Sequence, residues 1–289
     1  MRHGRSVGAV AAAVLLTLVI SGCTASETSP VTDANQLPEV SIDGYEDVTA
    51  TLDYEHAIAV TPVTAISVQG PDYMIRLLHA IAVRGDKCMV EAGFEPVADE
   101  RDWSPYLQEE DRTYGLWSVA YASQYGVSLA SGTGAPDVNV IDMGVERGKQ
   151  YGLCLDEGRE SLREELLWSG DMNIDSQIRL RAYELTLASD EGQAAKADWQ
   201  GCMEDAGIVL DSADGRPVQQ YQERGKEAEI AAIVVEAECA RSTNAVQTLY
   251  DIQARYEAAL MDTQSAQIQA FIEKRDEVIS VFEDAIAGR

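Results

Sequence analysis

The sequence predicts a mainly α-helical fold: a helical body of two repeated units with two disulfides, followed by a long C-terminal helix or helical hairpin. Two observations lead to this fold class. Residues 226–287 contain neither glycine nor proline, and their apolar side chains recur at helical spacing. A six-residue motif, Cys-Met-Val-Glu-Ala-Gly at residues 88–93, recurs as Cys-Met-Glu-Asp-Ala-Gly at residues 202–207.

The C-terminal segment has the strongest helical pattern. At about 1.5 Å per residue, one continuous helix over residues 226–287 would reach about 90 Å, far more than a compact domain spans. We therefore expect either a projecting helix or a hairpin that turns near residues 261–265. The apolar positions behind this expectation are Ile230, Val234, Ala237, Val246, Leu249, Tyr256, Leu260, Ile268, Phe271, Ile272, Ile279, Phe282 and Ile286.

Each copy of the repeated motif is typical of the last turn of a helix that ends at a left-handed glycine. One further cysteine follows each copy in a helical context. Four cysteines can pair in three ways. If each repeat closes on itself, the bridges join Cys88 to Cys154 and Cys202 to Cys239. Loop closure over such lengths would stabilise the fold by up to about 4 kcal/mol per bridge. No Cys-x-x-Cys motif occurs, so we interpret all four as structural.

The two repeats define two expected units, residues 44–170 and 171–289. Within them, helical patterns cover residues 72–91, 153–167, 176–188 and 189–205, with Asp72 and either Ser189 or Asp190 as N-caps. The apolar run 57–60, which ends at Thr61 and Pro62, fits either an edge strand or a buried turn, and it is left unassigned.

The N-terminus has the parts of an export signal. Arg2 and Arg5 precede an apolar stretch over residues 7–20, which is shorter than the roughly 20 apolar residues that span a bilayer. The sequence Ile-Ser-Gly-Cys at residues 20–23 then resembles the lipobox of bacterial lipoproteins. A plain secretion signal with a chance cysteine is the alternative.

The lipobox resemblance implies a modified and anchored mature protein. Residues 1–22 would be removed as the signal peptide, and the thiol of Cys23 would carry diacylglycerol with acyl chains such as palmitate. Two acyl chains suffice for stable anchoring. Residues 23–43 would form a flexible linker, because they are rich in Ser, Thr and Pro. The body would then be extracytoplasmic, at the outer face of the cytoplasmic membrane.

The charge of the chain limits its partners. It has 49 acidic and 22 basic residues, a formal net charge of −27. Such a body is repelled by the phosphates of nucleic acids and by anionic lipid head groups, which excludes nucleic-acid binding. The expected membrane contact is therefore the N-terminal lipid.

No catalytic, metal-binding or cofactor signature is present in the sequence. The motifs of zinc proteases, serine hydrolases and P-loop proteins are absent. Carboxylate clusters at residues 109–111 and 164–165 could supply a glycosidase acid and base, but 49 acidic residues produce close pairs by chance. His56 and His79 fit packed or surface residues, and residues 211–215 lack the ligand spacing of a calcium loop. We expect no enzymatic activity and no cofactor.

Aromatic residues offer a weaker functional hint. Tyr114, Trp117, Tyr121 and Tyr125 recur at spacings of three and four, so they could form a stripe that stacks on glycan rings. Core packing is the commoner use of such a stripe. Trp199 lies three residues before Cys202, and we expect it to cover that disulfide.

Several of these motifs occur together in a recognisable order. They are Cys88-Met89 with Gly93-Phe94, Tyr114-Gly115-Leu116, Tyr125-Gly126, Cys154, Trp199 with Cys202-Met203 and Gly207, Glu229-Ile230, Cys239 and Thr243-Asn244. This set resembles a family of uncharacterised secreted proteins and lipoproteins from actinobacteria, over most of the chain after about residue 45. The chain departs from that pattern at Ile208, where an aromatic residue would be expected. The resemblance implies an exported, mostly helical, disulfide-bonded protein and transfers no activity or binding residue.

The sequence as a whole favours a lipid-anchored envelope protein that binds or assists a partner, either another envelope protein or a glycan, without catalysis. An exposed apolar stripe along the C-terminal helices would support this hypothesis. The first alternative is a cell-wall-active enzyme that uses unidentified carboxylates, which a pocket with two carboxylates of perturbed pKa would support. The second is a solute-binding lipoprotein of a transporter, although the alternation of strands and helices that such proteins need is not evident.

Overall fold

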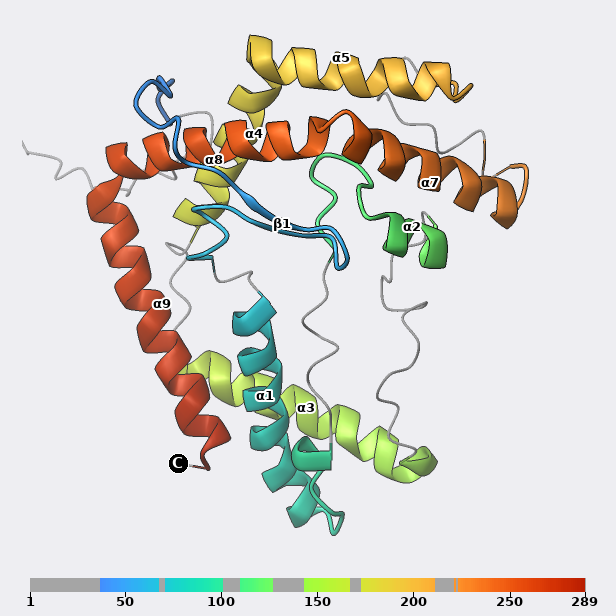
Figure 1. The fold of residues 1–289 in the computed structure, drawn as a ribbon. Coiled ribbons are helices and arrows are strands. Elements are labelled where there is room, and N and C mark those ends of the chain that lie inside the picture. Colours follow the sequence, from blue (N-terminus) through green and yellow to red (C-terminus); the bar gives the residue numbers. More distant parts are fainter. Residues whose placement is uncertain are drawn as a thin grey trace, which may run out of the picture. The chain divides into compact units, whose positions relative to one another are not determined.

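The computed structural model describes residues 37–67, 71–100, 110–126, 143–166, 173–210, 221 and 223–288 (Figure 1). The fold is mainly helical, as predicted. Its elements are, in chain order, β1 (Thr51–Asp53), β2 (Ile58–Val60), α1 (Pro71–Glu91), the 3-10 helix η2 (Ala98–Glu100), α2 (Val119–Tyr125), α3 (Gly144–Leu166), α4 (Ile174–Ala188), α5 (Asp190–Asp205), α7 (Lys226–Ser242), α8 (Ala245–Thr263) and α9 (Ser265–Ile286). Within these ranges no helix combines the length and the apolar character that a membrane crossing requires.

The helices predicted from residue spacing lie close to the observed ones. α1 begins at Pro71, a favoured first helical residue because proline has no N–H group to leave unsatisfied there. Ser189 is the N-cap of α5, and its hydroxyl oxygen accepts a hydrogen bond from the Gly192 N–H at 3.0 Å. α3 begins at Gly144, well before the predicted residue 153, because its first turns are polar and rich in glycine and show no apolar period.

The unassigned apolar run contains a short strand. β2 pairs with β1 in an antiparallel hairpin, with Thr51 opposite Val60. Asp53 closes the turn between them, because its Oδ1 accepts hydrogen bonds from the N–H groups of Glu55 and His56. Ala57 completes the turn in the left-handed region with φ 56°. The partner strand β1 has too few apolar residues for periodicity to reveal it.

Residues 226–286 form three helices rather than one helix or a simple hairpin. The expected turn near residues 261–265 is confirmed, because α8 ends at Thr263 and α9 leaves it at a corner (Figure 1). A second break, between α7 and α8, was not predicted. There Asn244 adopts φ 58°, and asparagine tolerates this left-handed conformation better than most other residues. The chain therefore turns without glycine or proline.

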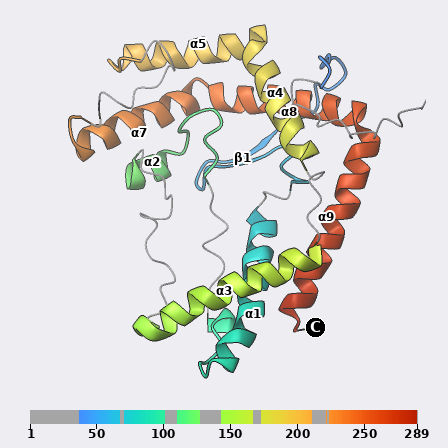
Figure 2. The same cartoon turned by 180° about the vertical axis from the view of Figure 1, so that it is seen from behind.

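One part of the core lies where α1 meets α3 and α9. Tyr73 of α1, Leu162 of α3 and Phe282 of α9 belong to one buried cluster. α9 also lies beside α1 when the molecule is seen from behind (Figure 2). The last helix of the second expected unit thus packs against the first helix of the first unit. The packing does not divide at residue 170, and all the described residues belong to one compact unit.

α1 and α3 approach closely at two glycines. A Cβ atom on Gly85 would lie 2.9 Å from the carbonyl oxygen of Cys154. One on Gly158 would overlap the carbonyl oxygen of Ile81. The backbones of the two helices are therefore in direct contact at these points, near the first disulfide.

Residues 37–67, here called the N-terminal arm, are fastened to α8 by side chains of that helix. The hydroxyl of Tyr45 donates to Asp262 Oδ2 at 2.6 Å, and the N–H of Ala50 donates to Asp251 Oδ1 at 2.9 Å. Leu37 is buried in a cluster with residues of α4, α8 and α9. Packed structure therefore begins inside the range 23–43 that was expected to be a linker, because Leu37 supplies an apolar side chain to the core.

Candidate functional site

The four body cysteines form two disulfides, Cys88 with Cys154 and Cys202 with Cys239. This is the pairing expected if each repeat closes on itself. Each bridge joins the last turn of one helix to a following helix, α1 to α3 in the first case and α5 to α7 in the second. The Cα atoms lie 5.4 and 5.6 Å apart, within the normal range for disulfides.

The two motif copies also share their backbone structure. In the first, the Phe94 N–H donates to the Met89 carbonyl at 2.9 Å; in the second, the Ile208 N–H donates to the Met203 carbonyl at 2.9 Å. The glycines before Phe94 and Ile208 have φ values of 84° and 76°. This is the Schellman arrangement of a helix C-terminus, which satisfies carbonyl groups that the helix leaves open. The sequence repeat is therefore a repeat in structure.

Both methionines are fully buried beside their disulfides. Met89 packs with Tyr151 and Cys154, and Met203 packs with Ile208 and Cys239. Ile208 fills the position that Phe94 occupies in the first copy, although the side chain is smaller. Trp199 packs on the second cluster, as predicted. Each copy of the motif, together with its disulfide and the residues packed on it, is thus a small core, here called a disulfide module.

This packing makes the modules staples rather than reactive centres. Cys154 is completely buried and Cys239 is nearly so. Cys88 and Cys202 are half-buried, but all four sulfurs are held in disulfides, and the nucleophile in cysteine chemistry is the free thiolate. The modules position helices and leave no thiol for chemistry.

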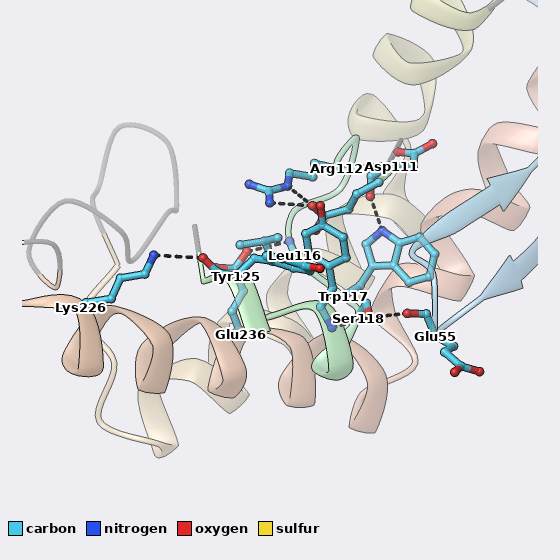
Figure 3. Close-up of polar contacts among 11 residues, drawn as sticks. Glu55, Asp111, Arg112, Leu116, Trp117, Ser118, Tyr125, Lys226 and Glu236 are labelled. Atoms are coloured by element: carbon cyan, nitrogen blue, oxygen red, sulfur yellow. Dashed lines mark hydrogen bonds and ion pairs between the residues drawn. The ribbon is translucent and has the colours of Figure 1, made fainter. Parts of the chain in front are cut away.

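The segment of residues 110–118, which precedes α2, forms a second cluster of polar contacts (Figure 3). The indole N–H of Trp117 donates to the carbonyl of Asp111 at 2.7 Å. The hydroxyl of Ser118 donates to the carbonyl of Glu55 on the hairpin turn at 3.3 Å, and the same oxygen caps α2 by accepting from the Tyr121 N–H. These contacts connect α2 to the hairpin.

The same segment is fastened to α7. The Leu116 N–H donates to Glu236 Oε1 at 3.0 Å, and the ammonium group of Lys226 donates to the carbonyl of Tyr125 at 3.0 Å (Figure 3). Glu236 is buried. Its carboxylate holds a backbone N–H group that would otherwise be buried without a partner.

The expected aromatic stripe is divided between the core and the surface. Tyr114 and Trp117 precede α2, and both pack against Tyr250 with ring centroids 4.9 and 6.0 Å away. Tyr121 and Tyr125 lie on α2, partly exposed, with centroids 4.6 Å apart. No continuous stripe exists, because Ser118 starts the helix only after Trp117. Half of the predicted glycan-stacking surface is therefore core.

Burial raises the pKa of two carboxyl groups that sequence reasoning did not single out as a pair. The side chain of Glu110 is 1% exposed and lies in an ion pair with Arg112 at 2.6 Å, which opposes the effect of burial. Glu257 is 0% exposed, and hydrogen bonds from Thr61 and Gln253 oppose the effect there. Both side chains are enclosed by protein.

The remaining candidates give no site. His56 lies on the exposed hairpin turn, and the hydrogen bond to Asp53 raises its pKa. His79 is a partly buried residue of α1. The proposed lipidation residue Cys23, the acidic residue Glu109 and the segment 211–215 lie outside the described residues, as do the side chains of Glu164 and Glu165. The described residues contain no cluster of His, Cys, Asp or Glu that could hold a metal.

The described residues of the C-terminal helices do not carry the exposed apolar stripe that would have been the main support for the interaction hypothesis. Within the described parts of the chain, no large apolar residue is strongly exposed on α7, α8 or α9. Their apolar side chains, such as Ile233, Ile252 and Phe271, are buried against α2, α4, α5 and the arm. Among the residues that the structure describes, the large exposed apolar ones are Val60, Val90, Val145, Leu153, Leu180 and Val209.

No family model matches the chain, and no curated protein or solved structure matches it either.

Proposed function

We propose that this chain is a lipid-anchored protein of the cell envelope, attached through Cys23 to the outer face of the cytoplasmic membrane, whose body binds or assists a partner without catalysis. The observation that carries the location is the pairing of four of the five cysteines in two disulfides. Disulfides persist in oxidising compartments outside the cytoplasm and are rare within it. The fifth cysteine is then Cys23, the lipobox residue.

The non-catalytic role is supported by how the buried carboxylates are used. Glu236 accepts the Leu116 N–H, Glu257 accepts the Val63 N–H, and Glu110 lies in its pair with Arg112. A catalytic acid or base must come within hydrogen-bond reach of a substrate. Glu236 and Glu257 instead hold loops against helices, and Glu110 is engaged by Arg112 of its own segment.

The partner surface that we propose is polar rather than apolar. The C-terminal helices use their apolar faces internally, so a partner meets the acidic exterior of a chain with net charge −27. Charged surfaces of this kind give specificity and steer association. A cationic region of an envelope protein, or the hydroxyl groups of a glycan, fits such a surface.

The anchoring part of the proposal is tested by fractionation. Wild type and Cys23→Ser would be expressed with labelled palmitate, and Ser26→Ala would serve as a control beyond the lipobox. We expect wild type and Ser26→Ala to carry label and to sediment with membranes. We expect Cys23→Ser to lose the label. A labelled, membrane-bound Cys23→Ser protein would contradict lipidation at this residue.

The binding part is tested by crosslinking in the intact envelope. The wild-type chain is captured with its crosslinked neighbours, and the released Cys23→Ser chain is the matched control for abundance without anchoring. We expect one protein or glycan to be enriched with the anchored chain. A cationic protein partner should be lost when the crosslinking is carried out at high salt, because salt screens charge interactions, whereas a glycan bound through its hydroxyl groups should be retained. Recovery of no specific species would count against a binding role.

A further inference from the structure

A chain of hydrogen bonds runs through the interior from the N-terminal arm to the buried aromatic residues. The Val63 N–H donates to Glu257 Oε2 at 3.0 Å, and Gln253 Nε2 donates to Glu257 Oε1 at 2.7 Å. The Tyr114 hydroxyl donates to Gln253 Oε1 at 2.7 Å. Gln253 and Glu257 lie one turn apart on α8, and both are almost completely buried.

Several elements pack around Glu257, and the charged and titratable groups that they bring to it are few. Arg179 of α4 is the charged group that acts on it and favours the ionised form, and Thr61 of the arm donates a hydrogen bond to it. The arm residues 61–67 contain no ionisable side chain. On the segment 110–118, the group that interacts with Glu257 is Tyr114, whose pKa is also influenced by Asp111 of the same segment and by Tyr183 of α4. α5 and α9 meet α8 elsewhere, at Leu249 and Leu260.

The observed pattern fits an ionised Glu257, because both of its carboxylate oxygens accept hydrogen bonds. A carboxylate only accepts hydrogen bonds, whereas a neutral carboxyl group must donate through one oxygen. Gln253 can accommodate either form, because half a turn of its amide exchanges donor and acceptor. Oε1 of a neutral Glu257 would donate to Gln253 Oε1, and Gln253 Nε2 would donate to the Tyr114 oxygen.

At the Tyr114 end of this series of hydrogen bonds, a second arrangement is also possible. Tyr114 has a hydrogen-bonding contact with the hydroxyl of Thr186 on α4. The Thr186 hydroxyl donates to the Ala182 carbonyl at 2.8 Å, so its oxygen still has accepting capacity. The Tyr114 hydroxyl can therefore donate to Gln253 in one state and to Thr186 in the other, and no buried group loses its partner.

We propose that these residues form a proton-operated switch: uptake of one proton from solvent by Glu257 reverses the hydrogen bonds at Gln253 and Tyr114 while Val63 stays bonded. One O–H bond forms on Glu257 as one O–H bond of a solvent hydronium ion breaks, and no covalent bond within the protein breaks. The Gln253 amide and the Tyr114 hydroxyl rotate, and every other proton stays on its atom. The switch thereby couples the protonation state of Glu257, which binds the arm through Val63, to the aromatic residues of the segment 110–118.

The pH at which the switch operates follows from burial. Removal from water disfavours the charged form and raises the pKa of Glu257, and this effect exceeds that of the hydrogen bonds and of Arg179, which oppose it. The reversal therefore occurs above the usual titration range of a glutamate carboxyl group. It also leaves the backbone contact to the arm in place, so it is distinct from acid unfolding.

The proposal is tested by NMR of the folded chain between about pH 4 and 8, a range that brackets a raised glutamate pKa. The side-chain amide resonances of Gln253 are followed in wild type, in Glu257→Gln and in the control Glu273→Gln, whose carboxylate accepts from Gln269 on the exposed face of α9. We expect one midpoint above the usual glutamate range in wild type and in the control. In Glu257→Gln we expect the resonances to stay near their acid-limit positions. Resonances that do not move in wild type, or a midpoint that persists in Glu257→Gln, would overturn the switch.

A second variant keeps the proposal testable if Glu257→Gln does not fold. Gln253→Met keeps the length of the side chain but removes both the donor and the acceptor of the relay. We expect the ring resonances of Tyr114 to respond to pH with the Glu257 midpoint in wild type, and to lose most of that response in Gln253→Met. A full response in the variant would show that Gln253 is not the connection.

Discussion

Glu257 carries a carboxyl group whose ionised form is disfavoured by its burial in the fold. It lies fully buried on α8, and burial raises its pKa. A group whose folded-state pKa exceeds its unfolded-state pKa contributes stability that is complete below the unfolded value, and this contribution is lost as pH rises through the folded value. Wild type should therefore lose stability between mildly acidic and neutral pH because of this residue.

Substitution of Glu257 by glutamine tests this pH dependence, because glutamine is neutral throughout. At neutral pH the free energy of unfolding of Glu257→Gln should equal or exceed that of wild type, by about 1.4 kcal/mol for each pH unit between the folded and unfolded pKa values. Below about pH 4, where Glu257 is protonated in both the folded and the unfolded chain, the difference should vanish. Urea denaturation at both pH values measures it, with Glu273→Gln as the exposed control. A variant that is markedly less stable than wild type at neutral pH would show that the ionised form is favourable.

Asn244 shows how a single residue can redirect a helix. It holds φ 58° between α7 and α8, and its side chain makes a long contact of 3.5 Å to Thr248. Alanine in this conformation is strained by about 1 to 2 kcal/mol, whereas glycine is not. We expect Asn244→Ala to lower the free energy of unfolding by about 1 kcal/mol and Asn244→Gly to leave it unchanged or raised. Gln264→Ala, at a junction with negative φ, is the control. Equal stability of both Asn244 variants would contradict this explanation.

At the scale of elements, α1 and α3 are held at close range by glycines as well as by the disulfide. A Cβ at Gly158 would overlap the backbone of α1, whereas one at Gly152, on the same helix, would meet nothing within 4 Å. We expect Gly158→Ala to destabilise the protein by about 1 to 3 kcal/mol through overpacking. Gly152→Ala should stabilise it by about 0.5 to 1 kcal/mol, because alanine favours the helix. Thermal unfolding of both variants measures the effect, and similar shifts would argue against close packing here.

The helices could be predicted where the apolar residues that pack in the core recur at helical spacing. α1, α4, α5 and the corner after Thr263 follow from spacing and caps. α3 was predicted only in part, because its first turns are polar and glycine-rich. The break at Asn244 was not predicted, because a single asparagine in the left-handed conformation does not change the helical spacing of the apolar residues around it. The aromatic stripe was misplaced for a related reason: Tyr114 and Trp117 keep a helical spacing in a segment that is not helical.

At the scale of the whole molecule, two long covalent loops constrain the unfolded chain. The bridged cysteines are 66 and 37 residues apart, so loop-closure entropy predicts about 4 kcal/mol of stabilisation for each. Replacing Cys88 and Cys154 together by alanine should lower the free energy of unfolding by about that amount. The pair Cys202 and Cys239 should cost slightly less. Urea denaturation of each double variant measures this, and a loss below about 1 kcal/mol would mean that the bridges are not staples.

The way in which the helices pack together was harder to predict from the sequence than the pairing of the cysteines. Parity and the repeated motif predicted both disulfides, because each motif carries its own cysteine and helix end. The contact of α9 with α1 and the docking of the arm on α8 were not predictable. They depend on single side chains, such as Leu37 and Asp251, whose partners lie about two hundred positions away in the chain. Long-range contacts of this kind leave no local period.

The central claim is that one cysteine carries lipid at the envelope while the other four are paired in the body. Mass spectrometry of the protein purified from membranes, alkylated before and after reduction, tests it most directly. We predict a mature N-terminus at Cys23 bearing diacylglycerol, no alkylation before reduction, and four alkylated cysteines after it, at positions 88, 154, 202 and 239. An unmodified Cys23, an N-terminus elsewhere, or free thiols before reduction would contradict the claim.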